Sequence, residues 1–297
     1  MTDFRERTIE VRGLPLRVRE RGPEGAPAVV LLHGWLDQRG SFDLLAPLLG
    51  DDVHTIALDH RGHGDSGWVG AGGFYHFVEY VADLDGALDA LGLALPQAAP
   101  VRLVGHSLGA AVALIYSATR PSRVAHAALL DGAPLMTRVT EIPLRIQQYL
   151  DDLRLPRTRK IVQSLDQAIE RMLRAQPTLP EPVARHLAGG GVGPDPTQQN
   201  ALAWKWDPLV RAHSPLPFSE SVLDALLPEV KAPVLLLRAA HGILPDAAEL
   251  RERLGKIARL TVEEVPGVGH HLHLQNAESV AERIRAAWLE AGFSHPC

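Results

Sequence analysis

The sequence is nearly free of cysteine and has no excess of positive charge. Its only cysteine is Cys297, the last of 297 residues, which excludes a disulfide framework and a cysteine-based zinc site. Thirty Lys and Arg residues stand against 35 Asp and Glu, and the net charge is −5. Such a balance offers no general attraction to nucleic acid or to an anionic membrane.

Long hydrophobic runs are also missing. The longest apolar stretches, such as Val29–Leu32 and Val234–Leu237, are far too short to span a bilayer. The first ten residues, MTDFRERTIE, lack the apolar centre of a secretory signal peptide. We therefore expect a cytoplasmic protein, a monomer or homodimer, whose partner is a small molecule rather than nucleic acid or a membrane.

What the sequence does contain is an alternation of strand-like and helix-like segments. The predicted strands are Thr8–Val11, Leu14–Arg19, Ala28–Leu32, Val53–Leu58, Val101–Val104, Ala125–Leu130, Val234–Arg238 and Leu260–Val265. The predicted helices are Ser41–Leu49, Phe77–Leu91, Leu108–Thr119, Asp246–Leu254 and Ala277–Glu290. This order predicts an α/β fold, in which helices cover both faces of a mostly parallel sheet.

The alternation stops in the middle of the chain. Between Pro134 and Pro228 the pattern favours helices, such as Leu144–Leu153 and Arg159–Arg174, and no clear strand. The run Gly189–Gly193 favours a turn. We expect residues 135–228 to form a mainly helical cap, inserted between two parts of one core, residues 1–134 and 229–297.

The sharpest motif is the stretch Gly105-His106-Ser107-Leu108-Gly109. It follows a predicted strand and opens a predicted helix, which is the context that the G-x-S-x-G nucleophile elbow requires. In such a turn the serine has a strained backbone, and the two glycines leave room for the chain to fold back. Ser107 is therefore the candidate nucleophile.

A serine nucleophile needs a histidine base, and three histidines follow the last predicted strand. We prefer His270 over His271 and His273, because the small residues Gly267–Gly269 directly before it let its ring reach the serine. The pair His271 and His273 also has the H-x-H spacing of a metal motif. No third ligand at a suitable spacing is evident, so we expect no metal and no other cofactor.

These motifs, with Ser107, Asp131 and His270 in this order along the chain, resemble the α/β-hydrolase superfamily over nearly the whole chain. Several stretches are more similar to the serine hydrolase-like protein family. They are Leu32–Asp37 with Ser41–Asp43, the turn Gly62–Ser66, Leu129–Asp131, Trp204–Pro208 and Leu237–Gly242. The resemblance implies an α/β-hydrolase fold and a serine hydrolase without naming its substrate.

The resemblance also implies an oxyanion hole. One donor is the backbone N–H of Leu108, directly after the nucleophile. The second comes from the loop His33-Gly34-Trp35, in which the residue after the His-Gly pair, Trp35, donates its N–H. Each such donor is worth ~3 kcal/mol of the reaction barrier. For His33 itself we favour a structural role, as a buried side chain that shapes the turn.

The acid of the triad is less plain. The family usually places it after the strand Val234–Arg238, where this chain has His241, which cannot orient an imidazole as a carboxylate does. Asp131, after the preceding strand of the sheet, is our first choice. Asp246 is the second, and the absence of any acid is the third. We expect an Asp131 oxygen to contact His270, and Ser107 Oγ to lie within hydrogen-bond reach of His270 or one water away.

Three functions remain open from the sequence. The first is a carboxylesterase-like hydrolase for a small neutral ester or lactone that forms an acyl-enzyme. The second is a ligand-binding or signalling module with little turnover, which the unusual turn at His241 favours. The third is cofactor-free perhydrolysis or C–C bond hydrolysis by the same triad.

Two further motifs are given structural interpretations. The glycines of Gly62–Gly67 match a dinucleotide fingerprint, but no helix follows them, as that fingerprint requires. We expect Asp59 and Arg61 to tie down this turn by a buried ion pair. The stretch Trp204–Asp207 predicts packing in the cap or a ligand wall.

Overall fold

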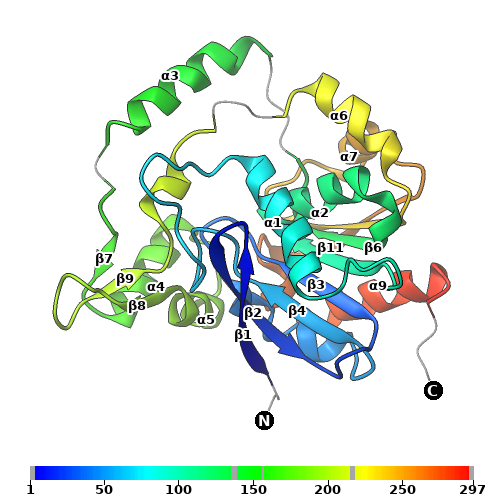
Figure 1. Cartoon of the computed structure of the whole chain (residues 1–297), viewed down its shortest axis with the longest axis horizontal. Coiled ribbons are helices and arrows are strands. Elements are labelled where there is room, and N and C mark those ends of the chain that lie inside the picture. The colour runs from blue at the N-terminus through cyan, green and yellow to red at the C-terminus, as the bar shows by residue number, and fades with distance from the viewer. Residues whose placement is uncertain (1–3, 135–138, 156, 215–217, 294–297) are drawn as a thin grey trace.

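The computed structural model describes residues 4–134, 139–155, 157–214 and 218–293 (Figure 1). Cys297 and the first three residues lie outside this part. The chain folds around an eight-stranded sheet. Its strands are β1 (Arg5–Val11), β2 (Leu14–Arg21), β3 (Ala28–Leu32), β4 (His54–Leu58), β5 (Val101–His106), β6 (Val124–Leu130), β10 (Val234–His241) and β11 (Leu260–Gly269).

The sheet has the order β1-β2-β4-β3-β5-β6-β10-β11. All pairs from β4 to β11 are parallel, whereas β1 and β2 form an antiparallel hairpin that joins the edge. The hairpin turns at Arg12 and Gly13, whose φ angles are 52° and 76°, as a two-residue turn of this hand requires. The predicted α/β-hydrolase fold and its strand–helix alternation are confirmed.

Helices cover both faces of the sheet. The larger ones outside the middle segment are α1 (Phe77–Ala90), α2 (Leu108–Thr119), α7 (Ala247–Leu254) and α9 (Ala277–Glu290), with the short α8 (Leu272–Gln275) before α9 and η3 (Pro121–Arg123) after α2. Alternate residues of β3 enter two separate clusters: Val30 belongs to the cluster that contains Leu84 of α1, and Leu31 to the cluster that contains Ile284 of α9. Because both faces are buried, every residue of β3 is apolar.

The predicted helix Ser41–Leu49 is wrong. The segment forms two 3-10 helices instead, η1 (Arg39–Phe42) and η2 (Ala46–Leu49). Gln38 caps the first of them through its side chain. Pro47 carries no N–H, so it cannot form the i→i−4 hydrogen bond that a continuous α-helix would need at this position.

The described residues of the middle segment are helical but also contain a small sheet. The helices are η4 (Val139–Glu141), α3 (Ile142–Asp152), α4 (Leu165–Ala175), α5 (Glu181–Gly191), η5 (Pro208–Arg211), α6 (Glu220–Leu226) and η6 (Leu227–Glu229). The antiparallel sheet has the order β7-β9-β8, from β7 (Ile161–Val162), β8 (Val192–Pro194) and β9 (Leu202–Trp204). Figure 1 shows α4, α5 and these strands grouped at one side of the molecule.

The expectation that this segment contains no strand is therefore wrong. Strands of two or three residues are too short to show an alternation of apolar and polar positions. The run Gly189–Gly193 is not a turn either: its first three glycines end α5, with Gly190 against the Gln38 side chain, and β8 begins directly after them. Within the described ranges, no helix is both long and apolar enough to cross a membrane.

Candidate active site

Ser107 lies on the sharp turn between β5 and α2. Its backbone has φ 52° and ψ −112°, so the positive φ expected of a nucleophile elbow is present. A Cβ at Gly109 would overlap the carbonyl group of Leu32, which explains why a glycine stands two residues after the serine. The turn holds Ser107 at the carboxyl edge of the sheet, at the N-terminal end of α2.

The loop after β3 passes close to this serine. The backbone N–H groups of Trp35 and Leu108 take part in no hydrogen bond among the residues that the structure describes. Both residues line the same cavity as Ser107. Their donors are therefore free to bind an oxygen atom of a ligand. The indole Nε1–H of Trp35 is engaged elsewhere, donating to the carbonyl oxygen of Val210 at 3.0 Å.

His33 has the structural role that we expected. Its ring is fully buried, and its Nε2 accepts the backbone N–H of His60 at 3.0 Å. The proton must therefore reside on Nδ1, which donates to the carbonyl oxygen of Gly34 at 2.7 Å. Burial, with His60 and His63 close by, lowers the pKa of His33 well below its ordinary value, so the ring is neutral and shapes the loop.

His270 follows β11 and contacts a carboxylate. Its Nδ1 lies 2.7 Å from Oδ2 of Asp131, which is the contact we expected between these residues. Asp131 is fully buried and also accepts the backbone N–H groups of Ala239 and Ile243, both at 3.0 Å. These donors hold the carboxylate in one orientation against the imidazole ring.

The turn after β10 explains why His241, and not a carboxylate, stands at the position where the family usually has its acid. A Cβ at Gly242 would overlap the Asp131 carboxylate, so the space is filled from the neighbouring strand β6. His241 is exposed. Asp246, the second choice for the acid, caps α7 by accepting the N–H groups of Ala248 and Glu249. The role of Gly242 and the two N–H groups that bind Asp131 were not predicted from the sequence. The presence of a glycine directly after His241 was the one signal in the sequence that could have indicated this arrangement.

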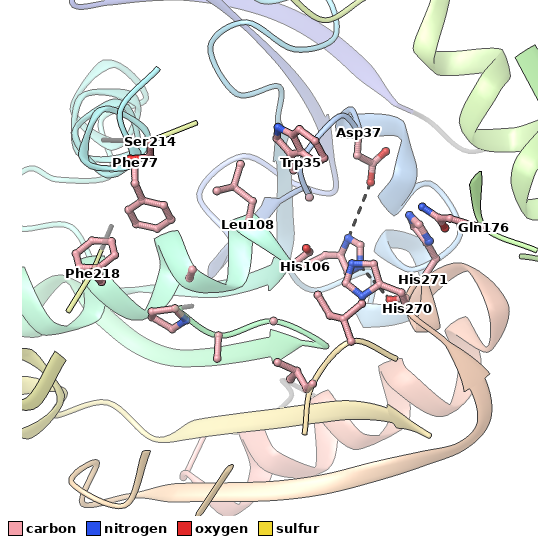
Figure 2. A pocket seen from close by; sticks show the side chains of 18 of the residues that line it. Trp35, Asp37, Phe77, His106, Leu108, Gln176, Ser214, Phe218, His270 and His271 are labelled. Carbon is pink, nitrogen blue, oxygen red and sulfur yellow. Dashed lines mark hydrogen bonds and ion pairs between the residues drawn. The ribbon is translucent and has the colours of Figure 1, made fainter. Parts of the chain in front are cut away.

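A cavity of about 480 Å³ is lined by Ser107, His270 and the two residues with free N–H groups, Trp35 and Leu108 (Figure 2). Phe77 and Phe218 lie at one end of it, and His270 and His271 lie at the other. Ser107 lines the cavity with His270. No hydrogen bond joins Ser107 Oγ to His270 among the described residues, so the expected approach of the two groups stays a prediction. The middle segment contributes Arg145, Gln176, Ser214 and Phe218 to the lining.

A second cavity of about 510 Å³ adjoins the first and shares Trp35, Asp37, Gln176 and His271 with it. Trp204 and Trp206 line it with rings stacked at 6.5 Å. The tryptophans predicted to pack in the cap or to form a ligand wall therefore do face a cavity.

The ion pair expected between Asp59 and Arg61 is absent. Asp59 is bound by Arg39, and Arg61 is bound by Asp83 of α1. Both pairs are buried, but the two side chains point to different elements, η1 and α1. The turn is therefore held by two ion pairs to neighbouring elements, and not by one ion pair within the turn.

Comparison with known proteins identifies the class. Residues 29–283 match the model of the alpha/beta hydrolase family, so the chain belongs to this family. It is 32% identical to a serine hydrolase-like protein of Danio rerio, over 91% of this chain and 83% of that protein. It is 27% identical to 2-(acetamidomethylene)succinate hydrolase of Mesorhizobium japonicum, over 95% of this chain and 94% of that protein.

Two solved structures share the fold over most of both chains. The hypothetical protein PA1622 of Pseudomonas aeruginosa superposes with a TM-score of 0.84 at 29% identity, covering 96% of this chain and 99% of that one. A thioesterase domain from the curacin biosynthetic pathway gives 0.81 at 25% identity, covering 95% and 99%. The resemblance to the serine hydrolase-like proteins that the motifs indicated is confirmed.

Proposed function

We propose that this protein is a serine esterase that cleaves a small neutral ester or lactone through an acyl-enzyme. The observation that carries the proposal is the contact of 2.7 Å between His270 Nδ1 and the buried Asp131 carboxylate, beside a serine on a strained elbow. Asp131 orients the ring with its proton on Nδ1, which leaves the Nε2 lone pair to act as the base.

The reaction then follows from this arrangement. His270 Nε2 takes the proton of Ser107 as Oγ attacks the carbonyl carbon of the ester. The carbonyl oxygen becomes an oxyanion, and the N–H groups of Trp35 and Leu108 donate to it. The positive end of the α2 dipole favours the same negative charge.

The tetrahedral intermediate then collapses. His270 returns its proton to the leaving alcohol, and the acyl group stays on Ser107. A water molecule attacks the acyl-enzyme, with His270 again accepting a proton, and the acid product leaves. Asp131 stays ionised throughout and stabilises the imidazolium that forms in each half of the reaction.

The cavity lining supports a small, neutral substrate. Phe77, Phe218, Ala111 and Leu244 present apolar surface near Ser107, and apolar surface around a few polar groups is typical of small-molecule sites. We assign residues 135–228 as the cap that closes over this substrate, and residues 1–134 and 229–297 as the core.

The binding-module alternative loses its main argument. It rested on the missing acid at His241, and Asp131 supplies a carboxylate to His270 from the adjacent strand. Perhydrolysis and C–C bond hydrolysis would use the same groups. A panel of short-chain esters, lactones and 1,3-diketones separates these chemistries by their products.

The direct test is covalent labelling together with pre-steady-state kinetics. We expect a fluorophosphonate probe to label Ser107, and a chromogenic acetate ester to give a burst of one alcohol per chain before steady turnover. Ser107→Ala should lose both signals while its unfolding temperature stays close to that of the parent. Unchanged turnover in Ser107→Ala would remove the proposal.

A further inference from the structure

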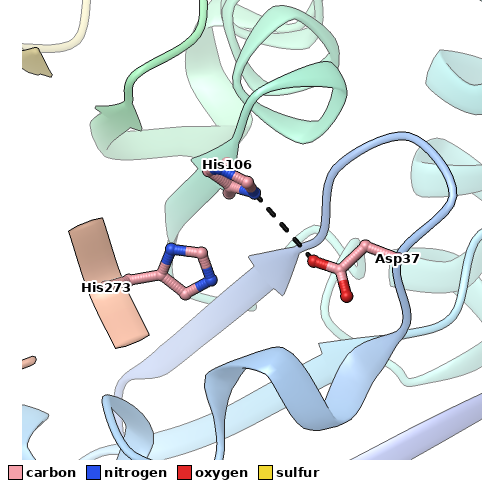
Figure 3. Close-up of side chains that lie close together, drawn as sticks. All are labelled: Asp37, His106 and His273. Atoms are coloured by element: carbon pink, nitrogen blue, oxygen red, sulfur yellow. Dashed lines mark ion pairs between the residues drawn. The ribbon is translucent and has the colours of Figure 1, made fainter. Parts of the chain in front are cut away.

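Three side chains from separate elements meet beside the active site (Figure 3). Asp37 lies in the loop after β3, His106 ends β5, and His273 lies in α8. One ligand atom from each lies within 4.8 Å of the other two. The rings of His106 and His273 are 4.4 Å apart. Both histidines are buried, and the Asp37 side chain is only 7% exposed.

Hydrogen bonding determines how His106 presents itself to this cluster. Its Nε2 lies 3.0 Å from the backbone carbonyl oxygen of His270, so Nε2 carries a proton and donates it. In the neutral ring Nδ1 is then a bare lone pair. This lone pair lies 4.0 Å from Oδ2 of Asp37, and no hydrogen bond joins the two buried atoms.

The remaining atoms of the cluster also lack partners. Asp37 Oδ2, His106 Nδ1 and both ring nitrogens of His273 are buried without a hydrogen bond in the part of the chain that is described. Leaving a buried polar atom unpaired lowers the stability of the fold. Several such atoms around one point indicate that an electron-pair acceptor belongs between them.

We propose that Asp37, His106 and His273 bind a divalent transition-metal ion such as zinc or cobalt. Two imidazole nitrogens and one carboxylate oxygen are ligands that these ions take readily. The hydrogen bond from His106 Nε2 to a backbone carbonyl is the outer contact that usually fixes the ring of a metal ligand. Bonds of ~2.0–2.2 Å require the ligand atoms, which now lie within 4.8 Å of one another, to draw together around the ion.

The site has a route for entry and a free coordination position. Asp37 and His106 both line the 480 Å³ cavity, so an ion can reach them from the substrate side. Three protein ligands leave the fourth tetrahedral position to water. Only His273 was singled out from the sequence, as half of the H-x-H pair, because Asp37 and His106 lie far away in the chain.

The test uses the full chain, stripped with a chelator and titrated with Co²⁺. We expect one bound ion per chain by calorimetry and the visible absorption of tetrahedral Co²⁺. Asp37→Asn and His273→Gln should each lower the Co²⁺ affinity by at least ~100-fold, beyond the loss that outer-contact changes cause. His126→Gln, a buried histidine in β6, is the matched control and should keep the affinity.

A second readout separates binding from folding. Co²⁺ should raise the unfolding temperature of the parent and of His126→Gln, but not that of the two ligand variants. Asp37→Asn has nearly the shape of the parent, so it decides the matter if His273→Gln fails to fold. Ser107→Ala should still bind Co²⁺, which keeps this test independent of the hydrolytic mechanism.

Several results would overturn the proposal. The absence of Co²⁺ binding at millimolar concentration would refute the metal site. Equal binding by the parent and both ligand variants would place the ion elsewhere on the chain.

Discussion

Replacing Asp131 by asparagine tests the acid of the proposed triad, because the change removes one charge and keeps the shape. Oδ2 accepts two hydrogen bonds, from His270 Nδ1 and Ile243 N, whereas Oδ1 accepts one, from Ala239 N. The asparagine oxygen should therefore occupy the Oδ2 position. Its amide group then faces the N–H of Ala239, which costs ~1–3 kcal/mol of stability.

In this orientation His270 keeps its tautomer, so the loss of activity comes from the missing charge. A unit charge at 2.7 Å is worth up to ~6 kcal/mol at an effective dielectric constant of ~20. Because each 1.4 kcal/mol changes a rate about tenfold, we expect kcat to fall by ~100-fold to ~10,000-fold. KM should change little, since the buried Asp131 does not line the cavity.

The assay is steady-state hydrolysis of a chromogenic short-chain ester, with Asp246→Asn as the control. Asp246 caps α7 and makes no hydrogen bond to His270. Asparagine is an equally good cap, so its variant should lose less than ~1 kcal/mol of stability, through the missing charge at the helix N-terminus, and keep its activity. Retention of more than about one tenth of kcat in Asp131→Asn, or an equal loss in Asp246→Asn, would refute the assignment of the acid.

Three other changes follow from the packing. Gly242→Ala should lower both kcat and stability, because the new Cβ meets the Asp131 carboxylate; normal activity in a folded variant would show that this carboxylate does not need its present place. Asp83→Asn should cost ~1–3 kcal/mol in urea unfolding, because the buried Arg61 charge then keeps only its ion pair with Glu79, and a cost below ~1 kcal/mol would contradict this. Burial lowers the pKa of His126 from 6.5 to about 4. As the pH falls, the His126 ring is protonated in the unfolded chain before it is protonated in the folded chain. The stability that this difference contributes above about pH 6.5 is therefore lost as the pH falls towards about 4. In His126→Gln the free energy of unfolding, measured with urea, should depend less steeply on pH across this range, by up to one proton taken up on unfolding. An unchanged slope would contradict a neutral buried ring.

The sequence predicted features that depend on local patterns. The apolar run Ala28–Leu32 and the elbow at Ser107 need only neighbouring residues, and both appear as expected. Resemblance to a family supplied Asp131 as first choice for the acid. The reason for its position, a glycine that leaves space for the carboxylate, became visible only with the neighbouring strand in place.

Long-range partners were beyond the sequence. Asp59 and Arg61 are two residues apart, yet each pairs with a distant side chain, because the three-dimensional neighbours decide where a buried charge is neutralised. The short strands β7, β8 and β9 have too few residues for a periodic signal. The cluster of Asp37, His106 and His273 needs three elements to be packed before it exists at all.

The indole of Trp35 has a consequence for timing. Through Nε1–H it is fastened to the carbonyl oxygen of Val210, within the segment that we assign to the cap, while its backbone amide is one of the two proposed oxyanion donors. A movement of η5 that admits substrate would stretch or break that bond and disturb the amide with it. The enzyme with η5 displaced would then be a poor catalyst. The Trp35 amide would stabilise the oxyanion fully only after η5 has closed over the bound substrate. An ester too large for η5 to close over would bind but would be hydrolysed slowly. Substrate size would therefore affect kcat more than binding affinity.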